Sequence, residues 1–105
     1  MDQFAALAEP TRRQIVEMLG EGPLAAGEIA ARFRISAPAV SQHLKVLKEA
    51  GLVRVEVAGQ RRIYSLDTAG LDAFESWVRK VRGFWNARLD LLETELGKPE
   101  AEEGE

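Results

Sequence analysis

The chain has 105 residues, no cysteine and a formal net charge of −3. This length fits one domain with a modest core, and the lack of cysteine excludes disulfides and zinc–thiolate sites. No apolar run is long enough to span a bilayer, and no basic-then-apolar leader precedes the first helix. We therefore expect a cytoplasmic protein with no membrane partner.

The charge is distributed unevenly along the chain. Residues 11–66 carry nine Lys/Arg against five Glu, whereas both flanks and the tail from Lys98 are acidic. A basic central segment suits contacts with phosphates, although an excess this moderate is also compatible with an ordinary solvated surface.

Apolar spacing and helix-ending residues predict four short helices in the first half of the chain. They cover about residues 2–8, 9–20, 23–33 and 36–51. Pro10 suits a first helical turn, and Ser36 can cap the fourth helix through its hydroxyl. Gly20 and Gly51 are expected to end the second and fourth helices.

The pattern then changes from helical spacing to alternation. Residues 52–57 and 61–66 alternate around a turn at 58–60, which predicts a β-hairpin. A last helix is expected from Asp67 or Thr68 to about Leu96, because Gly97 and Pro99 follow. The predicted fold is mainly α, a winged helix-turn-helix with four short helices, a hairpin wing and a long C-terminal helix. Residues 1–97 form the expected DNA-binding and dimerisation domain, and residues 98–105 the expected disordered acidic tail.

The fourth helix has two chemically different faces. Its core stripe is expected at Val40, Leu44, Leu47 and Ala50. The opposite half presents Pro38, Ser41, Gln42, Lys45, Lys48 and Glu49. Glutamine can pair with adenine, serine can bond a base edge, and small apolar groups such as Ala37 can touch a thymine methyl. Lysines further along would meet phosphates, so this face predicts a helix that reads the major groove.

His43 lies about 60° to the side of the core stripe, given about 3.6 residues per helical turn. Two roles stay open for the chain's only histidine: packing at the edge of the fold, or offering one nitrogen to DNA.

Three segments, "EPTRRQIVEML", "LAAGEIAARFRISAPAVSQHLKVLKEAGLV" and "VAGQRRIYSL", resemble the bacterial ArsR family of winged-helix repressors. The resemblance implies a homodimer that binds a palindromic DNA operator and represses transcription. It also implies that Ser41, Gln42 and His43 lie at the DNA, with Gln60, Arg61 and Arg62 of the wing reaching the minor groove or backbone. The candidate DNA-binding residues are Ser36, Ala37, Pro38, Ser41, Gln42, His43, Lys45, Lys48, Gln60, Arg61 and Arg62.

The sequence departs from the metal-sensing members that it resembles. Their cysteine pair on the third helix corresponds to Ala25 and Gly27, which have no ligand atoms. No histidine follows His43, and carboxylates on an exposed helix are usually only solvated. We therefore expect no metal and no cofactor, and an unidentified small-molecule effector is the further partner that the resemblance leaves open.

The last helix carries more apolar surface than a small domain can cover. Some 29 residues at about 1.5 Å each reach roughly 43 Å. Apolar surface of this kind is typically buried by a partner, which predicts a two-fold helical dimer interface. Its candidate residues, with two on the first helix that the resemblance places nearby, are Phe4, Leu7, Leu71, Phe74, Val78, Val81, Trp85, Leu89 and Leu92. The competing interpretation is an aromatic pocket for an apolar effector, formed by Trp77, Phe84 and Trp85.

Other classes of function fit less well. An enzyme needs a nucleophile with an oriented base, and one histidine without cysteine leaves few such arrangements. The alternative to a DNA-binding repressor is a winged-helix adaptor that binds protein, because this fold alone does not fix function. An adaptor would be expected to present apolar or acidic residues where this chain has Ser, Gln and Lys.

Overall fold

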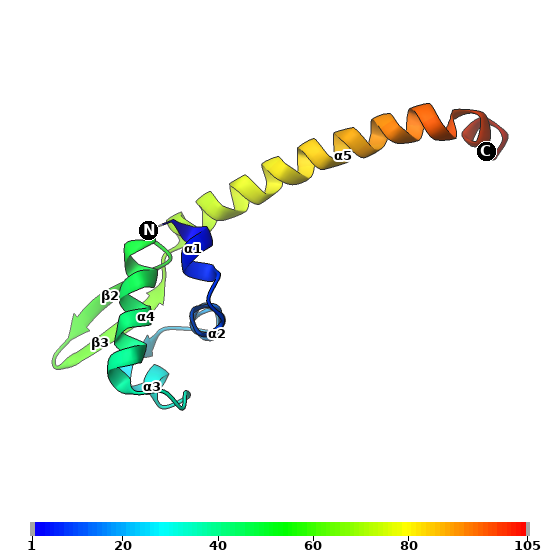
Figure 1. Ribbon diagram of the computed structural model, residues 1–105. Helices are drawn as coiled ribbons and strands as arrows, with labels where there is room; N and C mark the ends of the chain where they lie inside the picture. Colours follow the sequence, from blue (N-terminus) through cyan, green and yellow to red (C-terminus); the bar gives the residue numbers. More distant parts are fainter. Residues whose placement is uncertain (1, 105) are drawn as a thin grey trace. The chain divides into compact units, whose positions relative to one another are not determined.

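The computed structural model describes residues 2–104, with side chains described from 2 to 96. The elements in chain order are α1 (Gln3–Leu7), α2 (Pro10–Leu19), β1 (Leu24–Ala25), α3 (Ala26–Ala30), α4 (Ala37–Glu49), β2 (Val53–Ala58), β3 (Arg61–Leu66) and α5 (Thr68–Gly104) (Figure 1). The chain divides into two compact units, Met1–Ala73 and Phe74–Glu105.

Helix α4 begins and ends where its sequence predicts. The Oγ of Ser36 accepts a hydrogen bond of 3.3 Å from the backbone N–H three residues later, which caps the first turn. Gly51 follows the helix with a φ of 78°, a conformation that glycine adopts without steric cost. The N–H of Leu52 then donates to the carbonyl of Leu47 at 3.0 Å, which closes the helix end and turns the chain into β2.

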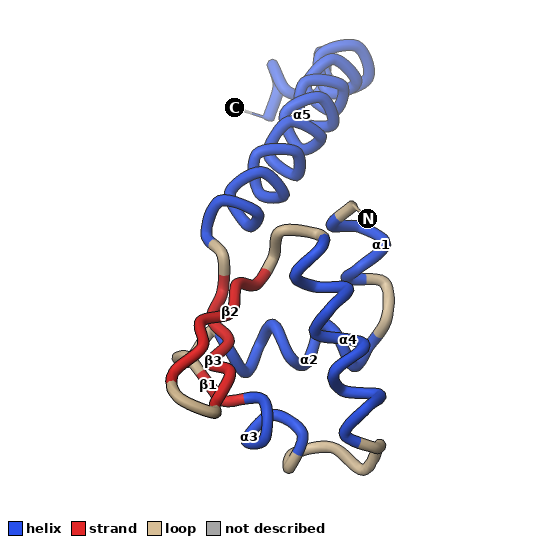
Figure 2. The backbone as a smooth tube through the Cα atoms, turned by 90° about the vertical axis from the view of Figure 1, so that its left-hand side faces the viewer, coloured by secondary structure: helices blue, strands red, loops and turns tan. Residues whose placement is uncertain are grey.

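The hairpin is confirmed, and the structure adds a strand that the sequence did not predict. Strands β2 and β3 pair antiparallel around a two-residue turn, with Ala58 opposite Arg61. Strand β1 pairs with the other edge of β3 and places Leu24 opposite Tyr64, so the sheet order is β1-β3-β2 (Figure 2). The expected helix over 23–33 is therefore wrong at both ends, because α3 spans only Ala26–Ala30.

The core of the first unit is built around the apolar stripe of α4. Val40, Leu44, Leu47 and Ala50 are all buried, as predicted. They pack with buried side chains of the other elements: Ala6, Ile15, Leu19, Ile29, Leu52, Val53 and Tyr64. Among the described residues no polar side chain is buried, so the polar face of α4 is left at the surface.

The start of α5 packs tightly against the turn that ends α4. A Cβ atom at Gly70 would overlap the carbonyl oxygen of Gly51. The backbone N–H of Asp67 donates to the carbonyl of Leu52 at 2.9 Å in the same region. Only a glycine at position 70 allows this approach without a shift of the backbone.

The end of α5 differs from the prediction. The backbone stays helical to Gly104, whereas Gly97 and Pro99 were expected to stop the helix near Leu96. A glycine and a proline lower helix stability, but they do not forbid a helical backbone, and the alanine and glutamates that follow favour it. The assignment of residues 1–97 to one domain and of 98–105 to a disordered tail stays a prediction, and Glu105 lies outside the described residues.

Candidate nucleic-acid interface

The exposed face of α4 carries the residues that the sequence predicts to read DNA. Ser41, Gln42, Lys45 and Lys48 are all exposed, on the side opposite the buried stripe. The first turn, formed by Ala37 and Pro38 after the cap residue Ser36, is exposed as well. Helical spacing and core packing together hold these side chains at the surface in one row.

An open groove of about 400 Å³ brings this face of α4 together with the β2–β3 hairpin, which we call the wing. It is lined by Ala26, Ser41, Gln42, Lys45, Lys48, Val55, Arg62 and Tyr64. Five of these residues are predicted DNA contacts, four from α4 and one from β3. Val55 and Tyr64, which face each other across the two strands, form the apolar part of the lining together with Ala26.

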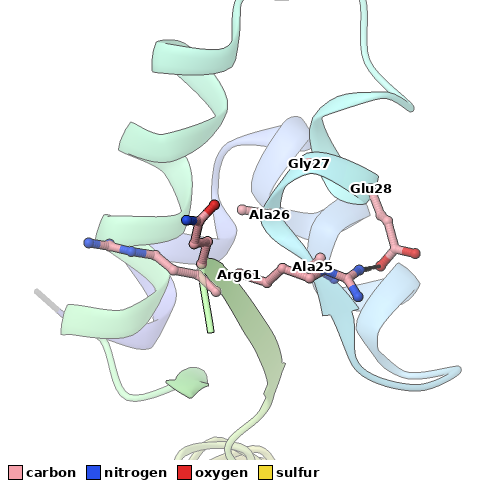
Figure 3. Close-up of a pocket in the computed structure, with 7 residues that line it drawn as sticks. Ala25, Ala26, Gly27, Glu28 and Arg61 are labelled. Atoms are coloured by element: carbon pink, nitrogen blue, oxygen red, sulfur yellow. Dashed lines mark hydrogen bonds and ion pairs between the residues drawn. The ribbon is translucent and has the colours of Figure 1, made fainter. Parts of the chain in front are cut away.

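Arg61, next to Arg62 in β3, pairs with a carboxylate of α3. Its Nη2 is 3.6 Å from Oε1 of Glu28, and the pair lies beside Ala25 and Gly27 (Figure 3). Gln60 lines the same hollow of about 520 Å³. Both charged side chains are more than half exposed, so this ion pair contributes little to stability. Arg61 thus pairs with Glu28, whereas Arg62 lines both this hollow and the groove that Gln42 lines.

Glu28 and Arg12 have positions that the sequence did not single out. Oε1 of Glu28 also accepts the backbone N–H of Ala25 at 2.7 Å, and so fixes the junction of β1 and α3. A glutamate three residues after the N-cap is a known helix-start signal when the N-cap itself is Ser or Thr. The N-cap here is Ala25, so the sequence lacked half of this signal. Arg12 stands out in the sequence only as one of the basic residues of the central segment.

His43 does not line the groove. It is partly buried, and its Nδ1 lies 3.1 Å from Nη1 of Arg12 and 3.9 Å from Oε1 of Glu9. Oε1 of Glu9 also accepts the backbone N–H of Arg12 at 3.0 Å. Burial raises the pKa of Glu9, but backbone hydrogen bonds from Arg12 and Thr11 and the positive charge of Arg12 lower it by more, so the pKa lies below its usual value.

The candidate dimer residues differ in how much of their apolar surface is already covered. Leu7 and Leu71 are partly buried against the core of the first unit, so much of their apolar surface is already covered. Phe4 is exposed, and Phe74 and Val78 are partly buried. Along the second unit, Val81, Trp85, Leu89 and Leu92 follow a three-or-four-residue spacing and are each 40–58% exposed. These four side chains form a continuous apolar stripe along α5.

No group of three or more His, Cys, Asp or Glu side chains is placed to hold a metal ion in the described part of the chain. Ala25 and Gly27, at the positions that correspond to the cysteine pair of metal sensors, lie in β1 and α3. Among the described helices none is long and apolar enough to cross a membrane.

Comparison with known proteins connects this geometry to a family. A helix-turn-helix domain family matches residues 7–56, from the end of α1 into β2. The HTH-type transcriptional regulator Rv2034 of Mycobacterium tuberculosis is 54% identical over 77% of this chain and 80% of its own length. The transcriptional repressor SdpR of Bacillus subtilis is 41% identical over 71% of this chain and 83% of its own length.

Solved structures agree with these relatives. A crystal structure of an ArsR family transcriptional regulator is similar over 79% of this chain and 91% of its own, with a TM-score of 0.74 and 30% identity. The homodimeric winged helix-turn-helix DNA-binding domain of Mb0332 from Mycobacterium bovis, described as a possible ArsR-family regulator, covers 75% of this chain and 73% of its own, with a TM-score of 0.61 and 29% identity. This chain therefore belongs to the ArsR family of winged helix-turn-helix transcriptional regulators.

Proposed function

We propose that this protein is a cytoplasmic homodimeric repressor that binds a two-fold symmetric DNA operator through α4 and the wing. The observation that carries the proposal is the groove in which Ser41, Gln42, Lys45 and Lys48 of α4 and Arg62 of β3 lie together. Hydrogen-bonding side chains sit beside cations there, which is the combination that a base-reading helix needs.

Each side chain has a role set by its chemistry. Gln42 reads adenine through its amide, and Ser41 bonds a base edge or a phosphate. Lys45, Lys48 and Arg62 contact phosphates, where their charge releases counterions. The exposed first turn, Ser36–Pro38, enters the major groove of the DNA first, and its small apolar groups meet a thymine methyl. Gln60 and Arg61 lie closer to the end of the wing and would contact the backbone or minor groove.

The dimer is proposed to form through α5. The exposed stripe of Val81, Trp85, Leu89 and Leu92 supports this, since an apolar row of that length is usually covered by a partner. One solved relative supports a dimer too, because its winged helix-turn-helix domain is homodimeric. Two copies of α4 in a two-fold dimer would read half-sites about 10–11 base pairs apart.

Selection from a pool of random duplexes tests the proposal. We expect the purified protein to enrich a sequence with an inverted repeat, called here the selected duplex, and to bind it at least about a thousandfold more tightly than a scrambled duplex of the same length. Equal affinity for the two duplexes would contradict sequence-specific binding. It would favour instead a winged-helix adaptor whose partner is a protein.

A further inference from the structure

Arg12 lies where α1, α2 and α4 meet, and it bonds to two of the other elements at once. Its Nε donates to the carbonyl of Ala6 at 2.7 Å, and its Nη2 donates to the carbonyl of Ala5 at 3.3 Å. Both carbonyls belong to α1. Its Nη1 lies 3.1 Å from Nδ1 of His43 on α4. One guanidinium therefore connects α1 to the helix that carries the candidate base readers.

The direction of the bond to His43 follows from the chemistry of arginine. A guanidinium has five N–H donors and no acceptor. Nδ1 of His43 must therefore accept, which makes the ring neutral and places its proton on Nε2.

A second hydrogen bond joins α1 to α4 two turns further along. Nε2 of Gln3 donates to the carbonyl of Ala50 at 3.1 Å, at the end of α4. His43 and Ala50 are seven residues apart, so both attachments lie on the same side of the helix. The buried stripe of α4 sets which side of the helix faces the core, and the two attachments restrain the remaining rotation about the helix axis. Such a rotation would move Gln42, the neighbour of His43, out of the groove.

We propose that Arg12 is a positioning residue for DNA reading, and that it acts through Nδ1 of His43. It holds α4 in the rotation at which Gln42 faces the groove, and His43 serves as the acceptor on the protein side instead of a DNA contact. The inference rests on the proposed function, because it explains how α4, the helix proposed to read DNA bases, is held in position.

Two substitutions of His43 separate this role from direct DNA contact. The Oδ1 of asparagine can take the place of Nδ1, whereas the amide of glutamine reaches the place of Nε2. We expect His43→Asn to keep the preference for the selected over the scrambled duplex within about threefold, and His43→Gln to lower it by about tenfold or more. The reverse order would show that His43 contacts DNA through Nε2 and would overturn the inference.

Arg12→Ala, with Arg13→Ala as its control, tests the other partner. Arg13 is the next residue on α2, is exposed and carries the same charge. We expect Arg12→Ala to lower affinity for the selected duplex by about tenfold and for the scrambled duplex by less than about threefold, while Arg13→Ala leaves the preference unchanged. An equal loss on both duplexes for Arg12→Ala would mean that Arg12 is only a phosphate cation, and would overturn the inference.

If Arg12→Ala does not fold, Arg12→Lys is the second variant, because lysine keeps the charge but cannot make the three hydrogen bonds of the guanidinium at once. The loss of preference for the selected duplex is expected to persist in this variant. Adding Arg12→Ala or Arg12→Lys to His43→Gln is expected to cause no further loss of preference, because both changes break the same bond. Fully additive losses would overturn the inference. A wild-type protein without any preference would overturn the proposed function itself.

Discussion

Side chains that share one groove are expected to contribute to DNA binding in different ways. Gln42→Ala removes a base-reading amide from each half-site, so it should weaken binding to the selected duplex by about 1–3 kcal/mol for each base that the amide reads and binding to the scrambled duplex far less. Arg62→Ala removes a cation from a phosphate and should weaken both alike. It should also make the salt dependence shallower by about one counterion for each phosphate that is no longer neutralised.

Titrations of both duplexes at several salt concentrations measure these two effects. The change at Gln42 should narrow the gap between the duplexes without changing the salt slope. Identical losses for Gln42→Ala and Arg62→Ala on both duplexes would show that α4 does not read sequence.

The lowered pKa of Glu9 predicts how stability changes in acid. Because the pKa in the folded state lies below its ordinary value of 4.5, the ionised carboxylate stabilises the fold above that pH. This contribution is lost as the pH falls through the lowered pKa. Urea unfolding between about pH 3 and 6 should show wild type more stable than Glu9→Gln at the upper end and the two converging at the lower end. Glu17→Gln, an exposed change on α2, is the control for a lost charge. A difference in unfolding free energy between wild type and Glu9→Gln that stays constant from about pH 3 to 6 would contradict the prediction.

Residues whose role depends on the helix face could be predicted from the sequence, whereas those defined by distant partners could not. The spacing from Val40 to Ala50 fixed the buried side of α4, and with it the exposed side. The role of Arg12 depends on carbonyls of α1 and on a histidine 31 positions later, and no local pattern announces such a bond. For the same reason the spacing left two roles open for His43.

Helices and strands, too, could be predicted where their signals are local and not where they depend on a distant partner. Helices with a cap, a periodic stripe and a terminal glycine were predicted within a few residues, as for α2 and α4. Strand β1 has only two residues, too few to show alternation, and it exists because β3 offers a free edge almost 40 residues later. The third helix was predicted too long because Leu24 and Ala25, which form that strand, are also good helix formers.

The junction at which α5 begins can be tested with two glycines of that one helix. Gly70→Ala places a Cβ on the carbonyl oxygen of Gly51, so the backbone must shift, and we expect a loss of roughly 1–3 kcal/mol in unfolding free energy. Gly83→Ala meets no atom within 4 Å and should raise helix stability by up to about 1 kcal/mol. Thermal or urea unfolding measures both. Equal effects at the two positions would show that the close approach to Gly51 does not constrain the fold.

At the scale of the whole molecule, the stripe on α5 predicts a dimer that is stable without DNA. Trp85→Asp would bury an unpaired charge in the interface, which costs several kcal/mol, so we expect dimer affinity to fall about a hundredfold or more. Ala87→Asp adds the same charge on the opposite side of the helix and should leave the dimer intact. Sedimentation equilibrium at micromolar concentration measures both variants. A folded wild-type monomer under these conditions would contradict the prediction.

The two-residue turn of the wing sets the register of the hairpin, and with it the face of the sheet on which each arginine of β3 lies. Neighbouring residues of β3 point to opposite faces of the sheet, so Arg61 meets Glu28 and Arg62 meets the groove. A shift of β3 by one residue would exchange these faces, but it would also move the buried Tyr64 out of the core. A single residue inserted before Arg61 is therefore expected to enlarge the turn and to leave both arginines on their present faces. Changes in the length of the wing should therefore alter how far its tip reaches, and not which arginine faces the groove.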